Sequence, residues 1–535
     1  MYIYIDNSRV IGEKMLKTYG RTTILANYTE EELLLLAQNK DLTSLDNVII
    51  EILKNSEDIH KKNHDESVYL KSYYYGDQDI KEKIKYTREE INNKTVENWA
   101  YAIIDFKKTY LLGKPIQYVQ LNNSGEEEIA VLNKYVRYEN KKAKDMQLYE
   151  DILVCGRGFR YTNKDKKIPP DEAPFELINC PVEDTEVVYS SKLGNEQLFS
   201  YIVTPKCYYV NITNDNGEVV TEPVNYDEFQ VYLRNKVLTY TNKDGNYSRI
   251  GDEKPLIWGE HIITEYYINK KRISLIELGK DLFNDINYLE SLDKDDMEQF
   301  VNAIMVFTNA EVSEQDLTDI KKLGAVCINS TEQKKASVDL LQGRLNALDT
   351  QTYYTRLLTA LHQILGVPVS SDSGTLTSGD TGKAKLTGQG YTSAGIRAEG
   401  DETMFGMCDY NSLKVILKIC RETPNSGIEK LIVSDIDSKF QRDMSDNLLT
   451  KTQGLMNLYS CDIPRKYANS LVNLFGDPNA VTKEQETLFG KQVSQLNSKT
   501  SNQNNDNNKY VSDDNKINYQ NNNIKNKNEI DNQGQ

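Results

Sequence analysis

The sequence is poor in the residues and runs that mark several common classes of site and location. Its seven cysteines are scattered singly, form no CxxC pair and are odd in number, so they favour neither a zinc ribbon nor a complete disulfide framework. The longest candidate apolar run, LLTALHQILGVPV, is shorter than the roughly 18 residues that a membrane span requires. The N-terminal MYIYIDNSRVIGEKM lacks the basic stretch and apolar core of a secretion signal. These absences predict a soluble intracellular protein with reduced thiols and no membrane contact.

Histidine is also scarce, with four residues in 535. His60 and His64 stand four apart in DIHKKNHDES, so a helix could place both on one face as metal ligands, but Lys61 occupies the position where the zincin signature requires Glu. We expect His261 and His362 to be packed or surface residues rather than catalytic bases. No GxSxG or Cys/His signature occurs. The sequence therefore predicts no enzyme, no cofactor and no metal site.

The formal net charge is −16, so the chain as a whole is acidic. Sequence-independent binding of nucleic acid over a wide surface needs clustered Lys and Arg that neutralise phosphates, and this charge argues against it. The acidic net charge is compatible with a channel through which DNA slides.

The stretch SSDSGTLTSGDTGKAKLTGQGYTSAG, residues 370–395, contains a GDTGKA run similar to a phosphate-binding loop. A P-loop requires Gly, four residues, Gly-Lys and then Ser or Thr, after a strand. Here Thr377 stands in place of the first Gly, Ala384 in place of Ser or Thr, and the preceding LLTALHQILG has helical spacing. We interpret the stretch as a flexible loop between helices. An NTPase that binds nucleotide at GDTGKA is the alternative.

Residues 25–270 predict a body of mixed helices and strands. Apolar spacing from Thr29 to Ser56 indicates short helices. In NNKTVENWAYAIIDFKKTYLLGKPIQYVQL, one apolar stripe indicates a helix that ends at Gly113 and Pro115, and IQYVQL then reads as a strand. Further β-rich runs follow, separated by Asn, Asp and Gly turns: FELINCPV, TEVVYS, FSYIVT, KCYYVNI, NKVLTYTN and EHIITEYYI. The fold class predicted is α+β.

A long helix is predicted from Ser274 to Ile304, because its apolar residues keep a helical period for about 30 residues, or roughly 45 Å. A second helix is predicted at about Leu345 to Leu365, and the β-like pieces IMVFTNAEV and GAVCINS lie between the two. This order is typical of a stalk that carries a knob. The remaining faces of the first helix are acidic, and they predict either a solvated surface or a wall that repels a polyanion; the residues are Glu277, Asp281, Asp285, Glu290, Asp293, Asp295, Asp296 and Glu298.

Beyond the glycine-rich stretch, MFGMCDYNSLKVILKIC resumes a helix, and the segment from Leu431 to Phe440 contains a strand. Two short amphipathic helices, LLTKTQGLMNLYS and RKYANSLVNLF, come next. From Ser501 onward 13 of 35 residues are Asn and apolar residues almost vanish, so this tail cannot bury enough surface to fold.

The ordered pieces resemble those of portal proteins from siphophages of Gram-positive hosts. The segment NNKTVENWAYAIIDFKKTYLLGKPIQY is similar to the family's helix that ends in Tyr-Leu-Gly-Lys-Pro-Ile, and YYYGDQDI precedes it. LYEDILVCGRGF, INKKRISLIELGKDLFNDINYLESLDKDDMEQFVNAIMVF and FQRDMSDNLLTKTQGLMNLYS agree as well. The resemblance runs in order from about Tyr73 to Gly476.

The resemblance implies a portal fold, with an α/β wing, a long-helix stem, a small α/β clip, a tunnel loop and a helical crown, in a ring of twelve subunits at one capsid vertex. It departs from the family at Gly388, Gly390, Gly395, Gly400 and Gly406, which interrupt the expected long helix, so the helix start is not predicted with certainty. The implied segments are 1–24 (N-terminal arm), 25–271 (wing), 272–305 and 345–366 (stem helices), 306–344 (clip), 367–386 (tunnel loop), 387–445 (long helix and returning wing strand), 446–490 (crown) and 491–535 (disordered tail).

The resemblance further implies three sets of site residues. The tunnel loop would meet DNA through Ser371, Ser373, Thr375, Thr377, Ser378, Lys383 and Lys385. The acidic face of the stem would line the channel with Asp281, Asp285, Asp293 and Asp296, and the clip would contact terminase through Glu311, Glu314, Asp316 and Asp319.

The implied function is a conduit for genome packaging and ejection that hydrolyses nothing itself. The implied partners are double-stranded DNA, the terminase large subunit, major capsid and scaffolding proteins, and head-tail adaptors. The implied location is the capsid vertex of the virion, with the host cytoplasm during assembly. A different virion structural protein, such as a head-tail adaptor, is the remaining alternative, against which length and the long helix argue.

Overall fold

The computed structural model describes residues 19–38, 42–86, 89–121, 126–164, 172–213, 219–301, 304–308, 337–341, 347–368, 390–441, 448–472, 474 and 481–491. The chain divides into two compact units, Met1–Ser445 and Asp446–Gln535, and each is described by itself.

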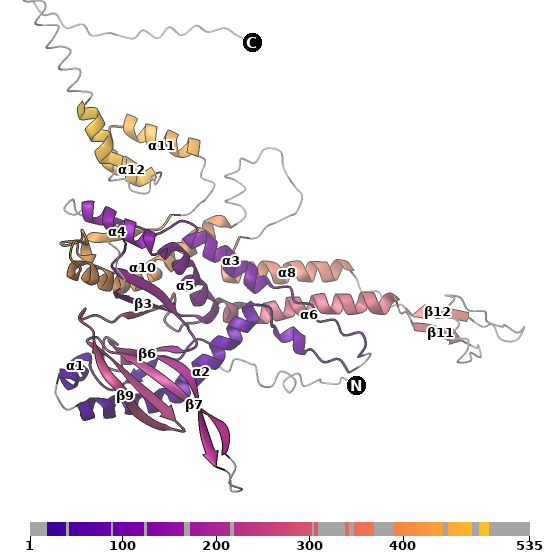
Figure 1. Cartoon of the computed structure of the whole chain (residues 1–535). Helices are drawn as coiled ribbons and strands as arrows, with labels where there is room; N and C mark the ends of the chain where they lie inside the picture. The colour runs from indigo at the N-terminus through magenta and orange to yellow at the C-terminus, as the bar shows by residue number, and fades with distance from the viewer. Residues whose placement is uncertain are drawn as a thin grey trace, which may run out of the picture. The chain divides into compact units, whose positions relative to one another are not determined.

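One part of the first unit is a six-stranded sheet covered by two helices (Figure 1). Its strands, in spatial order, are β1 (Ile24–Ala26), β5 (Thr185–Ser190), β6 (Gln197–Thr213), β7 (Val219–Tyr232), β8 (Lys236–Lys243) and β9 (Asn246–Pro255). Strand β1 runs parallel to β5, and the other neighbours are antiparallel. Helices α1 (Glu30–Gln38) and α2 (Leu42–Tyr74) cover this sheet: Leu33 and Ile49 of the helices share one core with Phe199, Val231 and Leu238 of the strands.

A second, larger core lies around the antiparallel sheet β10-β3-β4. Its strands are β10 (Ile263–Tyr266), β3 (Gly158–Lys164) and β4 (Phe175–Cys180). The helices α3 (Trp99–Leu112), α4 (Glu126–Tyr138), α5 (Lys141–Cys155) and α10 (Tyr391–Glu422) pack around it, and α2 and the helices described next contribute residues as well. After α10 the chain returns to this body, because β13 (Ile436–Lys439) pairs antiparallel with β2 (Gln117–Gln120). The prediction of an α+β fold is therefore confirmed.

Two helices leave this body side by side: α6 (Leu275–Val301) and α8 (Ala347–Leu365) (Figure 1). Beyond the far end of α6, β11 (Ile304–Thr308) and β12 (Ser337–Leu341) form an antiparallel two-stranded ribbon. Strand β12 was not predicted; the predicted strand GAVCINS lies outside the described residues.

The second unit contains α11 (Leu448–Ser460), α12 (Arg465–Val472) and a helical segment at 481–491. The Tyr459 hydroxyl donates to the Asn469 side chain at 2.5 Å, and the Asn469 amide donates to Thr482 at 3.0 Å. These bonds join the three helices. Over the described part of the whole chain, no helix is both long and apolar enough to cross a membrane.

Two expectations about local structure need correction. The region predicted to hold short helices is mostly one helix, α2, of 33 residues, because buried Asn63, Glu66 and Ser67 continue its packed face where apolar residues are absent. Helix α10 starts at Tyr391 and runs through three of the glycines that were expected to interrupt it, because packing of Phe405 and its buried neighbours outweighs a cost of about 1 kcal/mol per glycine. The predicted boundary at residue 24 between an N-terminal arm and the wing stays a prediction; β1 begins at Ile24.

Candidate functional site: the paired helices α6 and α8

The first turn of α6 is fixed by a capping box. The Ser274 hydroxyl accepts the Glu277 backbone N–H at 3.1 Å, and the Glu277 carboxylate accepts the Ser274 backbone N–H at 2.7 Å. The same buried carboxylate accepts the Gly20 N–H at 2.9 Å and pairs with Arg21 at 2.5 Å. Arg21 also pairs with Glu66 of α2 at 2.8 Å. The root of α6 is therefore tied to two distant segments of the first unit.

Two glycines allow the backbone to pack closely at this root. Gly156, the C-cap of α5, has φ +84°, and a Cβ there would lie 1.9 Å from the Arg272 carbonyl oxygen. Gly20 has φ +83°, and a Cβ there would lie 2.2 Å from the Lys271 carbonyl oxygen. Neither position accepts a side chain without a shift of backbone. Backbone packing therefore explains why glycine occupies position 156 in the Cys-Gly-Arg-Gly run.

One face of α6 is apolar and packs against α8. Ile276, Phe283 and Ile286 are buried on it. A Cβ at Gly279 would lie 3.1 Å from Leu365 and 3.2 Å from Leu361, so glycine permits the close approach of the two helices. Since the last turn of α8 meets the first turns of α6, the helices are antiparallel.

A second face of α6 binds the strap, the name used below for residues 78–86 and 89–98. In Figure 1 the strap begins on the side of α6 away from α8, and its end reaches α8, where the Tyr354 hydroxyl donates to the Glu97 carboxylate at 2.6 Å. Every third or fourth residue of α6 contributes a polar contact to it, which keeps the contacts on one side of the helix. The pairs are Lys280 with Asp79 (3.2 Å), Asn284 with Asp79 (3.1 Å), Asn287 with the Glu97 N–H (2.7 Å), Ser291 with the Thr95 N–H (2.9 Å) and Asp295 with the Asn93 N–H (2.6 Å).

Asp295 is the most strongly held of these contacts. Its carboxylate is buried and pairs with Lys83 at 2.9 Å and Lys85 at 3.2 Å, in addition to the backbone and side chain of Asn93. Burial by itself raises the pKa of Asp295, but the hydrogen bonds from Asn93, Lys83 and Lys85 outweigh it and lower the pKa to about 2. Asp295 and Glu277 are therefore buried anchors, which corrects the expectation that both belong to a solvated surface or to a wall that repels a polyanion.

A third face of α6 is exposed. Asp281 and Asp285 lie on it, and neither forms an ion pair within the described residues. Burial first, and then the neighbouring Asp281 charge, raise the pKa of Asp285. Asp293 and Asp296 are half-buried. Of the four predicted carboxylates, Asp281 and Asp285 thus lie together on the exposed face. Asp293 and Asp296 are less exposed.

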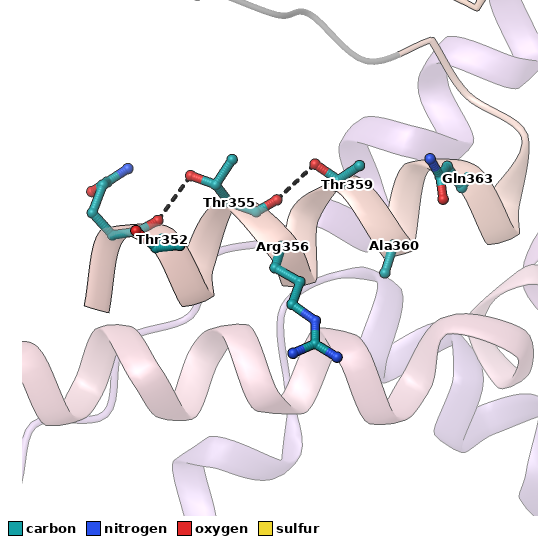
Figure 2. Close-up of a pocket in the computed structure, with 7 residues that line it drawn as sticks. Thr352, Thr355, Arg356, Thr359, Ala360 and Gln363 are labelled. Carbon is teal, nitrogen blue, oxygen red and sulfur yellow. Dashed lines mark hydrogen bonds between the residues drawn. The ribbon is translucent and has the colours of Figure 1, made fainter. Parts of the chain in front are cut away.

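The outer surface of α8 is polar and slightly hollowed. An open hollow of about 630 Å³ is lined by Gln351, Thr352, Thr355, Arg356, Thr359, Ala360 and Gln363. Figure 2 shows Thr355 and Thr359 on the side of α8 away from α6, with each hydroxyl donating to the carbonyl one turn earlier, at 2.8 and 2.7 Å. Arg356 projects toward the flank of α6 (Figure 2), and it makes no ion pair with any residue that the structure describes.

The end of α8 and the start of α10 are held together. Arg397 of α10 donates to the carbonyls of Ile364 at 2.7 Å and Gln363 at 3.0 Å, so a cation caps the negative end of α8. His362 Nδ1 lies 2.8 Å from the Pro368 carbonyl oxygen. A Cβ on Gly390 would lie 3.7 Å from Pro368 Cα, so the chain leaves the described body and returns to it at one place.

Helix α10 is locked into the larger core by a buried carboxylate. Asp409 accepts the Tyr118 hydroxyl at 2.6 Å and the Tyr266 hydroxyl at 2.9 Å, and it pairs with Lys141 at 3.1 Å. Burial alone raises the pKa of Asp409, but the Lys141 charge, the Tyr118 hydrogen bond and the Arg160 charge outweigh it, so the pKa lies below its ordinary value. The helix that follows residues 369–389 thus has a fixed position.

Several predicted site residues lie outside the described residues. These are the seven tunnel-loop residues Ser371, Ser373, Thr375, Thr377, Ser378, Lys383 and Lys385, and the clip residues Glu311, Glu314, Asp316 and Asp319. His60 and His64 do lie on one helix, but His60 lies near Glu186, and His64 lies near Asp65 and Asp184. The described residues contain no group of three His, Cys, Asp or Glu side chains that could hold a metal ion.

Sequence reasoning missed the residues that anchor α6. The Ser-Leu-Ile-Glu run at 274–277 is a capping-box signature and could have been recognised from the sequence. The strap gives no such signal, because its pairing with α6 is a long-range contact between segments about 200 residues apart.

Comparison with known proteins gives two matches. The family model described as "Phage portal protein, SPP1 Gp6-like" matches residues 53–505. The portal protein of Bacillus phage SPP1 is 23% identical over 234 residues, which is 41% of this chain and 42% of that protein. The alignment thus spans less than half of the relative's length, whereas the family model spans most of this chain.

Proposed function

This chain belongs to the SPP1 Gp6-like family of phage portal proteins, and from that premise we propose that it is one subunit of a ring at a capsid vertex, through which double-stranded DNA enters and leaves the head. The observation that carries the proposal is the extent of the family match, which includes the body, both paired helices and α10. The proposal includes twelve subunits in the capsid, and docking of terminase, scaffolding and major capsid proteins and, later, head-tail adaptors.

Within this proposal each part of the chain has a role. Residues 25–271, with β13, form the wing, and α6 and α8 form the stem. Residues 306–344 form the clip, and the helices of 446–490 form the crown. The capping box and the Arg21 pair at the root of α6 join the proposed stem to the proposed wing.

The exposed face of α6 suits a channel wall. Each phosphate that a protein neutralises releases counterions and adds affinity, so a wall of cations would hold DNA rather than let it slide. Asp281 and Asp285 carry unpaired negative charge on the only face of α6 that neither α8 nor the strap covers in the described structure. We assign this face to the channel, with Asp293 and Asp296 adding to the field of negative charge.

The segment 369–389 suits a loop that meets passing DNA. Its serines, threonines and glycines are small, and Lys383 and Lys385 can touch phosphates transiently. The closed base at Pro368 and Gly390 supports this role, because α8 and α10 hold fixed positions on either side of the segment. The acidic residues Glu311, Glu314, Asp316 and Asp319 are assigned to terminase docking on the family resemblance alone.

Electron microscopy of the purified full-length chain tests the proposal. Rings with a central channel are the expected result, and uniformly monomeric protein at micromolar concentration would contradict it. A binding assay with Mg-ATP separates the alternative at GDTGKA: no saturable binding is expected. Tight, magnesium-dependent binding that Lys383→Ala abolishes would favour an NTPase instead.

A further inference from the structure

A ring built from identical subunits by rotation needs two different lateral surfaces on each subunit that fit each other. The stem offers two candidates once its exposed face is assigned to the channel, and the inference below rests on that proposed function. At about 100° per residue, the three faces of α6 lie roughly a third of a turn apart. With one face directed to the channel, α8 lies to one side of α6. The outer part of the strap, residues 79–86 and 89–93, lies to the other side.

The surface on the α8 side is a cationic hollow. Its floor consists of short side chains, Thr355, Thr359 and Ala360, which leave room for large side chains from another molecule. Arg356 stands at its edge with no ion pair to the rest of the described chain. Two large side chains on the same helix are exposed nearby along its length, Tyr353 (47%) and Ile364 (49%).

The surface on the strap side has the opposite character. Ile84 is 57% exposed and Tyr86 is 71% exposed, although both lie in a segment that is otherwise held firmly to α6. Glu89 and Glu90 are exposed and form no ion pair within the described residues. Asp295 holds Lys83, Lys85 and Asn93, which flank these groups, against α6. The surface is therefore present in a single subunit.

We propose that the strap of one subunit docks on the α8 hollow of the next subunit in the ring, with Tyr86 and Ile84 over the threonine floor and Glu89 or Glu90 paired with Arg356. The occupant is a second copy of this chain, because the two surfaces are complementary in charge and in side-chain size, and a chain carries one of each. A segment this polar would gain little from an uncharged or apolar partner, whereas an ion pair between subunits sets register as well as affinity.

Charge reversal on each surface tests the pairing. Arg356→Glu places Glu89, Glu90 and a third carboxylate together, and Glu89→Lys with Glu90→Lys places two lysines against Arg356. Each variant is expected to reduce the fraction of chain in rings about tenfold at fixed concentration, since the repulsion recurs at every interface. Lys254→Glu, which makes the same charge change on the exposed side of β9, is the matched control and should assemble as wild type.

Mixing the two defective variants gives the sharper result. A subunit with Arg356→Glu and a subunit with Glu89→Lys and Glu90→Lys restore opposite charges at both kinds of interface when they alternate around a ring. Equimolar mixing should therefore restore rings, measured by native mass spectrometry as equal amounts of the two masses. A variant that merely misfolds would not be rescued.

The outcomes separate this inference from the proposed function. If wild-type rings form and both reversed variants assemble equally well, or if mixing fails to restore rings, the strap and hollow are not the interface, while the portal assignment stands. If the wild-type chain forms no rings at all, the proposed function and this inference fail together.

Discussion

Replacing Asp295 with Asn should release the outer part of the strap from α6. The carboxylate pairs with Lys83 and Lys85 and accepts the Asn93 N–H, and its pKa is lowered to about 2 from an ordinary value of 3.8. At about 1.36 kcal/mol per pKa unit, this lowering of the pKa corresponds to roughly 2 kcal/mol. Because Lys85 is partly exposed and water screens its charge, about 1 kcal/mol is the expected loss.

Hydrogen exchange at the amides of residues 91–97 is the direct assay, because a loss of about 1 kcal/mol should speed exchange about fivefold there and leave the core amides unchanged. The pH dependence has a definite sign. A carboxyl with a lowered folded-state pKa stabilises the fold above about pH 4, and this contribution disappears as pH falls toward 2. The difference in exchange between wild type and Asp295→Asn should therefore shrink over that range.

Asp296→Asn is the matched control for this experiment, since it removes the same charge from the next residue of α6, which is only half-buried. Equal acceleration in the two variants would show that helix charge rather than the buried pairing matters. A pH-independent difference between wild type and Asp295→Asn would refute the electrostatic account.

Three further changes test other parts of the structure. Gly156→Ala should cost at least about 3 kcal/mol of unfolding free energy in thermal or urea denaturation, because it adds a Cβ at positive φ against a carbonyl oxygen; a loss below 1 kcal/mol would contradict the packing described. Gly400→Ala should raise the unfolding free energy by about 0.5–1 kcal/mol, since nothing lies within 4 Å of its Cβ position, and a loss in the monomer would contradict this. Replacing Asp281, Asp285 and Asp293 together with Lys should leave rings intact but slow DNA packaging in a phage complementation assay; unchanged packaging would place these side chains away from the channel.

Local signals in the sequence were sufficient for the larger elements. The helical spacing of apolar residues located α6 and α8 to within a few residues, because each helix buries one continuous stripe. The α+β class followed from β-rich runs separated by turn residues. The return of the chain after α10 was also predicted, and β13 pairs with β2 within the predicted strand.

Long-range polar contacts were beyond such reasoning. Nothing near Asp295 in the sequence distinguishes it from Asp293 or Asp296, yet Asp295 is a buried anchor and the others are half-exposed. Asp295 differs because it pairs with Lys83 and Lys85, which lie about 210 residues earlier in the chain. The spacing of residues around Asp295 does not predict a pairing over that distance. The same holds for α2, whose polar middle looks solvated until the buried partners of Asn63 and Glu66 are known.

The shared exit and re-entry point at Pro368 and Gly390 makes the intervening 21 positions a cassette. Arg397 caps α8 and Asp409 fixes α10 through contacts with other described residues, so both flanking helices should keep their positions when the number of residues between them changes. Related phages could thus exchange this stretch by recombination, and an engineer could graft a peptide tag or a foreign loop there, with both flanking helices as a ready-made splice junction.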